Sequence, residues 1–178
     1  MTFPQLLARY AAPTLAGMKC ASLVSLKPLN GHIDEWIPLL EEKGLRFFHL
    51  KTERSIRLVL VYREEMLSKA LSSQEAKSIL RPLGYDEEMQ TALEHLRTRF
   101  LSVPCPHEIG LFLGYPANDV IGFIENNGSN FKLSGLWKVY GDEESALRLF
   151  ARYEKCRKAY ISFLENGANL IKLCKKTA

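Results

Sequence analysis

Residues 104–123, with the sequence PCPHEIGLFLGYPANDVIGF, are the part of the chain that decides the fold. They combine bulky apolar residues with three glycines, three prolines and an adjacent histidine and glutamate. Apolar side chains gain stability on burial, and glycines in such a setting allow close approach of another backbone. A polar pair buried among them needs partners or a chemical role. We therefore predict that this stretch packs helices onto a sheet and holds His107 and Glu108 near a cavity.

The length and composition bound the class of protein. A chain of 178 residues predicts one globular domain over residues 1–178. Its 47% hydrophobic and 25% charged residues are ordinary for a globular protein. No run approaches the ~18 apolar residues of a membrane helix, and the first residues lack the pattern of a secretory signal. We expect a cytoplasmic protein without a membrane partner.

The formal net charge is +4, with basic and acidic residues interleaved along most of the chain. The one unopposed basic cluster is Lys172, Lys175 and Lys176. A nucleic-acid-binding surface usually presents a longer basic stripe. We therefore expect no nucleic-acid partner, and the sequence leaves the oligomeric state open.

Apolar runs and alternations predict about five strands, at residues 18–26, 45–51, 55–62, 131–140 and 169–174. The connection 52–54 is short enough to make the second and third of them an antiparallel hairpin. The third is apolar on both faces from Leu58 to Val61, which is typical of a central, covered strand.

Helical spacing, caps and breakers predict helices, among them residues 3–10, 32–43, 64–71, 87–101 and Asp142 to about Glu165. Residues 27–31 read as a loop. A run of helices interrupts the strands, so the predicted fold class is α+β: a single-domain sandwich in which helices cover a mixed sheet of about five strands, one hairpin included.

Pro106 suits the first position of a helix, which would place His107 and Glu108 in its first turn. The zinc-protease motif needs a second histidine where Leu111 stands, so we predict no metal site. Adjacent helical residues point about 100° apart. One interpretation is that Glu108 caps or forms a salt bridge while His107 hydrogen-bonds across a packed interface. The alternative is acid–base chemistry by the pair.

Six polar residues lie on segments that we expect to pack, and they are the candidates for binding a small molecule or cofactor of unknown identity: Lys19, His107, Glu108, Asp119, Lys138 and Tyr140. Lys138 and Tyr140 are two residues apart on one predicted strand and therefore share a face, so both can point into one pocket. The alternative places Lys138 in solvent and Tyr140 at a rim.

The four cysteines form no Cys-x-x-Cys pair and match no zinc spacing. Cys20, Cys105 and Cys156 are the candidate thiols of an alternative in which the protein is an enzyme. Free cysteines more often pack as small apolar residues, and we expect that for Cys156. A third alternative is a protein–protein interaction module that exposes Phe112, Tyr115 and Phe123.

Several motifs resemble a bacterial family, the domain of unknown function numbered 3793: PHEIGLFLGYP at 106–116, DVIGFI at 119–124 and WKVY at 137–140. APTLAGMKCASL at 12–23 and CRKAY at 156–160 are also similar to that family. The resemblance implies a bacterial intracellular protein and no particular activity. Family members often carry His-Cys where this chain has Tyr10 and Ala11, so the resemblance implies no thiol or metal mechanism at that pair here.

Overall fold

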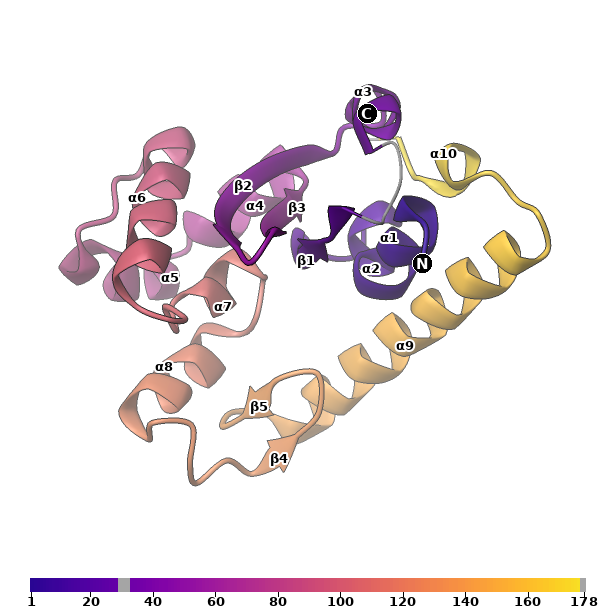
Figure 1. Ribbon diagram of the computed structural model, residues 1–178. Coiled ribbons are helices and arrows are strands. Elements are labelled where there is room, and N and C mark those ends of the chain that lie inside the picture. The colour runs from indigo at the N-terminus through magenta and orange to yellow at the C-terminus, as the bar shows by residue number, and fades with distance from the viewer. Residues whose placement is uncertain (29–32, 177–178) are drawn as a thin grey trace. The chain divides into compact units, whose positions relative to one another are not determined.

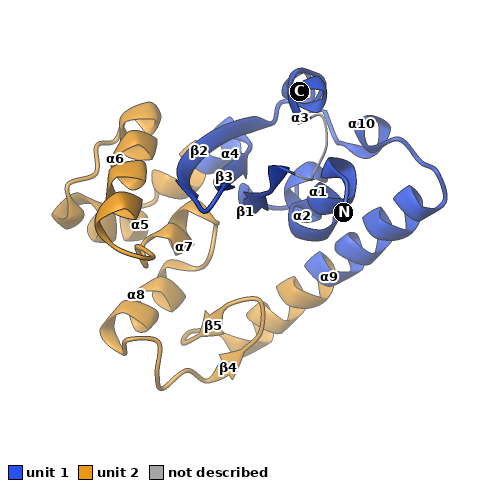
Figure 2. Ribbon diagram, in the orientation of Figure 1, with its two compact units in different colours: residues 1–67, 153–178 blue, residues 68–152 orange. Residues whose placement is uncertain are grey.

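The computed structural model describes residues 1–28 and 33–176 (Figure 1). The chain divides into two compact units (Figure 2). Unit 1 consists of Met1–Leu67 together with Tyr153–Ala178, and unit 2 is Ser68–Arg152. Helices α4 (Glu64–Leu71) and α9 (Glu143–Glu165) each continue along the chain from one unit into the other. That all 178 residues form a single domain stays a prediction.

Unit 1 contains a three-stranded antiparallel sheet in the order β1-β3-β2. The strands are β1 (Ala21–Leu26), β2 (Arg46–Glu53) and β3 (Ile56–Tyr62). Tyr62 pairs with Ala21 on one side and Arg46 on the other. Arg54 and Ser55 form the tight turn with φ values of 47° and 65°, as two-residue hairpins require. The predicted hairpin and the central position of its second strand are confirmed.

Among its described residues, unit 1 contains the helices α1 (Phe3–Tyr10), α2 (Ala12–Leu15), α3 (Ile33–Glu41) and α10 (Leu170–Leu173), the first residues of α4 and the C-terminal part of α9. Helix α1 begins with a capping box, in which Thr2 and Gln5 satisfy each other's backbone N–H groups. The predicted start of α3 at His32 and most of the predicted loop 27–31 lie outside the described residues.

The buried side chains of α1, α2, β1 and β3 form the core of unit 1 with Tyr160 from α9 and Leu170 from α10. Cys156 packs against this core, as predicted. Arg63, directly after β3, is only 1% exposed. Its guanidinium donates to the carbonyls of Thr14 (2.6 Å), Leu15 (2.7 Å) and Lys175 (2.7 Å). This single side chain therefore links the end of α2, the end of β3 and the segment after α10.

Unit 2 is mainly helical. Its elements, besides parts of α4 and α9, are α5 (Gln74–Leu80), the short 3₁₀ helix η2 (Arg81–Leu83), α6 (Met89–Ser102), α7 (Ile109–Phe112), α8 (Ala117–Glu125), β4 (Leu133–Ser134) and β5 (Lys138–Val139). Strands β4 and β5 pair as a small antiparallel hairpin. Leu93, Leu96 and Phe100 are buried and form the apolar face of α6.

The prediction of one sheet of about five strands is wrong. Within the described residues there are a three-stranded sheet in unit 1 and the β4–β5 pair in unit 2. Residues 131–140 do not form one strand, because the chain reverses between Gly135 and Trp137, where the Gly135 N–H donates to the Trp137 carbonyl at 3.0 Å. Residues 169–174 hold helix α10 because the Asn169 side chain caps it by accepting from the Ile171 N–H.

None of the described helices is both long enough and apolar enough to span a bilayer.

Candidate functional site

The turn before α7 places His107 and Glu108 differently from the prediction. The Pro106 carbonyl accepts from Ile109 N–H at 3.1 Å, and the His107 carbonyl accepts from Gly110 N–H at 3.3 Å. Both residues thus lie in a tight turn, and α7 begins only at Ile109. The prediction that they occupy the first turn of a helix is wrong, because these i to i+3 bonds precede the helix.

The side chain of Glu108 is buried in a cluster with Tyr85 and Arg99. It is 2% exposed, and its Oε1 accepts from the Tyr85 hydroxyl at 3.0 Å and from Arg99 Nε at 2.7 Å. Burial alone would raise the pKa of Glu108, but the hydrogen bonds from Arg99, the backbone and Tyr85 hold the pKa below its ordinary value. Burial and the neighbouring carboxylate raise the pKa of Tyr85. Glu108 is therefore an ion-paired structural residue.

The imidazole of His107 lies on a different side. It is exposed and contacts the ring of Phe123 edge-on, with centroids 4.9 Å apart. There it lines a cavity of unit 2 together with Cys105. The neighbouring histidine and glutamate therefore do not act on one atom.

This cavity has a volume of about 370 Å³. We call it the hairpin cavity, because its wall comes from the turn before α7, from α7 and α8, and from the β4–β5 hairpin. Most of its lining is apolar or aromatic, and the lining residues are Cys105, His107, Ile109, Gly110, Tyr115, Asp119, Val120, Phe123, Ser134, Gly135, Leu136, Trp137 and Lys138.

Asp119 fixes the hairpin side of the cavity. This residue of α8 is 3% exposed. Its Oδ2 accepts from Trp137 Nε1 at 2.7 Å, and its Oδ1 accepts from the backbone N–H groups of Tyr140 and Gly141 at 2.8 Å each. Trp137 in turn stacks on Tyr115 with centroids 4.7 Å apart and planes 24° apart. The carboxylate therefore sets the position of an aromatic wall.

Lys138 brings a positive charge to the cavity. Its side chain is half-buried, and Nζ donates to the Gly128 carbonyl at 2.6 Å. Nζ lies 4.8 Å from the ring centroid of Phe131 and 5.7 Å from that of Phe123, a cation–π geometry.

Three of the six candidate ligand residues, His107, Asp119 and Lys138, are thus brought together, and the candidate thiol Cys105 lies with them. Tyr140 does not line the cavity: its ring packs against Gly122 and its hydroxyl donates to the Ser129 carbonyl at 2.9 Å. The expectation that Lys138 and Tyr140 share one pocket fails because β5 ends at Val139, before Tyr140.

The remaining candidates belong to unit 1. Lys19 is half-buried, and burial lowers its pKa to about 8 although the Cys20 thiolate opposes this shift. Burial raises the pKa of Cys20 and of Cys156, so both thiols stay protonated and weakly nucleophilic at neutral pH.

The sequence reasoning missed the aromatic and apolar wall. Tyr115 and Phe123 are partly buried cavity residues, and Phe112 is fully buried, so these three do not form the exposed patch of the interaction-module alternative. The glycines of this stretch were a usable signal, because a glycine permits close packing. The structure shows such packing at Gly110, where an added Cβ would lie 2.8 Å from the Val120 side chain.

Over residues 1–28 and 33–176, no cluster of three or more His, Cys, Asp or Glu could hold a metal ion.

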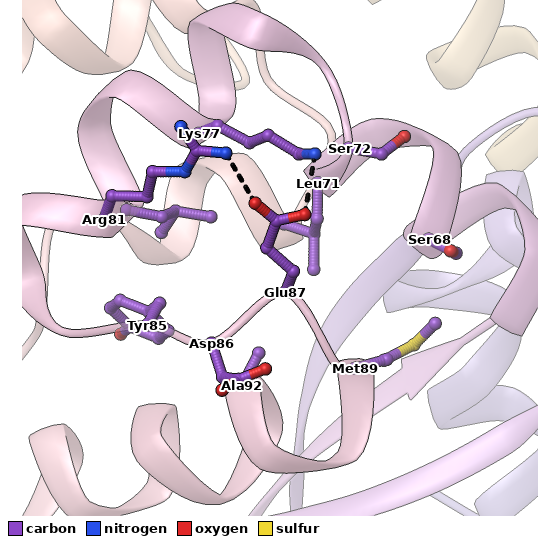
Figure 3. Close-up of a pocket in the computed structure, with 11 residues that line it drawn as sticks. Ser68, Leu71, Ser72, Lys77, Arg81, Tyr85, Asp86, Glu87, Met89 and Ala92 are labelled. Carbon is purple, nitrogen blue, oxygen red and sulfur yellow. Dashed lines mark hydrogen bonds and ion pairs between the residues drawn. The ribbon is translucent and has the colours of Figure 1, made fainter.

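A second, smaller cavity of about 70 Å³ lies beside α5 and the start of α6 (Figure 3). There the Glu87 carboxylate lies between Lys77 Nζ (2.9 Å) and Arg81 Nη2 (2.5 Å). Hydrogen bonds from Arg81 and Lys77 lower the pKa of Glu87 to about 2. A volume of this size is large enough for water but too small for an organic ligand, and both cations are already paired with the Glu87 carboxylate. The hairpin cavity is therefore the better candidate site.

Comparison with known proteins identifies a family. No curated protein and no solved structure shows a significant match to the chain. The family described as "Protein of unknown function (DUF3793)" matches residues 7–174. The motifs around the cavity lie within that range, and the chain belongs to this family.

Proposed function

We propose that the protein is a small-molecule-binding module and that the hairpin cavity of unit 2 is its binding site. The observation that carries the proposal is a cavity of about 370 Å³ with an aromatic and apolar wall and few polar groups. Ligand sites in proteins typically have volumes of about 300–1,000 Å³ and a lining of this kind.

The rigidity of the wall supports the same proposal. Trp137 is held by its hydrogen bond to Asp119, by its stacking on Tyr115 and by an edge contact with Phe150 at 4.5 Å between centroids. A side chain fixed before binding loses little conformational entropy when a ligand arrives. The wall is therefore suited to receive a flat apolar surface.

The proposal is tested with N-phenylnaphthylamine, an uncharged dye whose emission rises in apolar surroundings. We expect saturable binding at one site per chain. Leu136 lines the cavity and is 51% exposed, so Leu136→Trp fills the cavity mouth without disturbing a core. We expect this variant to weaken dye binding about tenfold, the effect of overpacking a site.

The matched control is Leu101→Trp, because Leu101 is also an exposed leucine of unit 2, 75% exposed, and does not line the cavity. Dye binding by this variant should equal that of the wild type. An independent readout is the alkylation of Cys105 by iodoacetamide, which bound dye should slow, since Cys105 is the exposed cysteine. Absence of saturable binding, or equal effects of the two tryptophan variants, would contradict the proposal.

A further inference from the structure

We infer that the ligand of the hairpin cavity is an organic acid, namely an apolar, preferably aromatic body that carries one anionic group. This inference rests on the proposed binding function and names the ligand class. The anionic group would bind Lys138, and the apolar body would lie against the aromatic wall.

The first argument is the bonding of the Lys138 ammonium group. A lysine ammonium has three N–H donors, and the Gly128 carbonyl, a neutral acceptor, accepts one of them at 2.6 Å. Among the described residues, no carboxylate forms an ion pair with Lys138. The half-buried charge therefore has donors left for an anion, and partial burial strengthens such a pair relative to solvent.

The second argument is that Asp119 does not offer an equal site for a cation. Its two oxygens already accept the three N–H bonds that hold the hairpin, and the residue is 3% exposed. A cationic ligand would have to compete with those bonds. The charge available to a ligand is thus mainly the positive one.

The third argument is the position of the aromatic rings around that charge. Phe123 contacts both the His107 ring, at 4.9 Å between centroids, and the Lys138 ammonium, at 5.7 Å. A ligand that places an anion on Lys138 therefore has an aromatic surface directly beside it. His107 adds an N–H donor in every protonation state. An aromatic acid matches all three features.

The experiment compares two dyes of the same skeleton, the anionic anilinonaphthalene sulfonate and the uncharged N-phenylnaphthylamine. The protein is the full chain with Trp36→Phe, which leaves Trp137 in the cavity wall as the remaining tryptophan. Quenching of Trp137 emission then reports binding at this site. We expect the anionic dye to bind about tenfold more tightly than the uncharged one, as a charge-assisted hydrogen bond provides.

Lys138→Gln should weaken the anionic dye about tenfold and change the uncharged dye less than about twofold. Lys138→Arg, which keeps the charge, should retain the preference. The matched control is Lys132→Gln, because the Lys132 ammonium also donates to a backbone carbonyl, that of Gly141 at 2.8 Å, but does not line the cavity. It should leave both affinities unchanged.

A salt titration of the protein that keeps Lys138 gives a second test, which does not depend on whether the Lys138 variants fold correctly. Added salt should weaken binding of the anionic dye and leave the uncharged dye unaffected, since salt screens charge pairs. If the uncharged dye binds as tightly as the anionic one, or a cationic dye binds best, the inference is wrong while the binding function stands. If neither dye quenches Trp137 saturably, the proposed function itself fails.

Discussion

At the scale of single residues, Asp119 shows how a charged side chain can serve the architecture of a site. One carboxylate accepts three N–H groups from the hairpin segment, one of them from Trp137. These donors compensate the buried charge, which would otherwise be costly. Asp119 thus positions the aromatic wall, and the free charge of the cavity is that of Lys138.

Asp119→Asn should therefore destabilise unit 2. The amide NH₂ would face either the indole N–H or the two backbone N–H groups, and none of these can accept a hydrogen bond. We expect the free energy of unfolding to fall by about 2 kcal/mol, the cost of losing buried charge-assisted bonds. Urea denaturation followed by Trp137 emission, in the Trp36→Phe background, measures the change.

Asp142→Asn is the matched control. The Asp142 side chain accepts from the Ser145 N–H at 3.0 Å at the start of α9, and asparagine is an equally good helix cap. Its stability should match that of the wild type. An Asp119→Asn protein as stable as this control would contradict the structural role of Asp119.

Lys19 predicts a dependence of stability on pH. Burial lowers its pKa to about 8, so between pH 8 and the ordinary lysine value the unfolded chain binds more protons than the folded chain. The free energy of unfolding should therefore gain a contribution that grows as pH rises through this window and is lost as pH falls back to about 8. Lys19→Gln should remove that contribution.

The comparison requires a Cys20→Ala background, because the raised pKa of Cys20 has the opposite sign: its folded thiol stays protonated while the unfolded thiol ionises, which lowers stability as pH rises. The measurement is urea denaturation at several pH values from about 7.5 to about 10. This range begins below the folded-state pKa of Lys19, about 8, and ends near the ordinary lysine pKa of about 10.4. Identical pH profiles with lysine and glutamine at position 19 would show that Lys19 titrates normally.

At the scale of elements, the segments with local start signals were predictable. Pro4 lies in the first turn of α1 and Asp142 lies at the start of α9, and both helices lie where the sequence placed them. The segments with weak local signals were not. Residues 131–140 alternate like a strand, but the tight approach at Gly135 is a tertiary effect that alternation does not reveal. In residues 169–174 the apolar run is too short to separate strand from helix.

Gly135→Ala tests this explanation of the hairpin. An added Cβ would lie 2.2 Å from Cε2 of Phe150, so the ring or the hairpin must move. We expect a loss of about 2 kcal/mol in the free energy of unfolding, typical of overpacking. In a Phe150→Ala background the same substitution should cost less than about 0.5 kcal/mol, because the clash is gone. Equal costs in the two backgrounds would contradict the close contact as the cause.

At the scale of the whole molecule, the discontinuous unit 1 was beyond prediction from local patterns. Nothing in residues 153–176 indicates by itself that they pack with α1 and β1, because such pairings depend on side-chain complementarity at long sequence separation. The site was partly predictable for a related reason. Chemistry-bearing side chains such as His107 and Lys138 stand out in a sequence, whereas the apolar residues that form a cavity look like ordinary core.

Arg63 is the residue that should contribute most to holding the N-terminal and C-terminal segments of unit 1 together. Arg63→Lys keeps the charge but cannot reach the carbonyls of Thr14, Leu15 and Lys175 together, because an ammonium lacks the planar fork of a guanidinium. We expect a loss of about 3 kcal/mol in the free energy of unfolding, since buried carbonyls lose their donors.

The control for Arg63→Lys is Arg57→Lys, an exposed arginine on the same strand β3, which should cost less than about 0.5 kcal/mol. Trp36 emission in a Trp137→Phe background reports on unit 1, because Trp36 packs against its core. Equal stabilities of the two lysine variants would show that the carbonyl contacts of Arg63 contribute little.

The division of the chain also sets an order of events during biosynthesis. The ribosome synthesises Ser68–Arg152 before Tyr153–Ala178, a segment that unit 1 requires. Nascent unit 2 can thus mature while the first segment of unit 1 still awaits its C-terminal helices. A chain truncated after Arg152 should therefore resist protease in its later half and remain cleavable in Met1–Leu67.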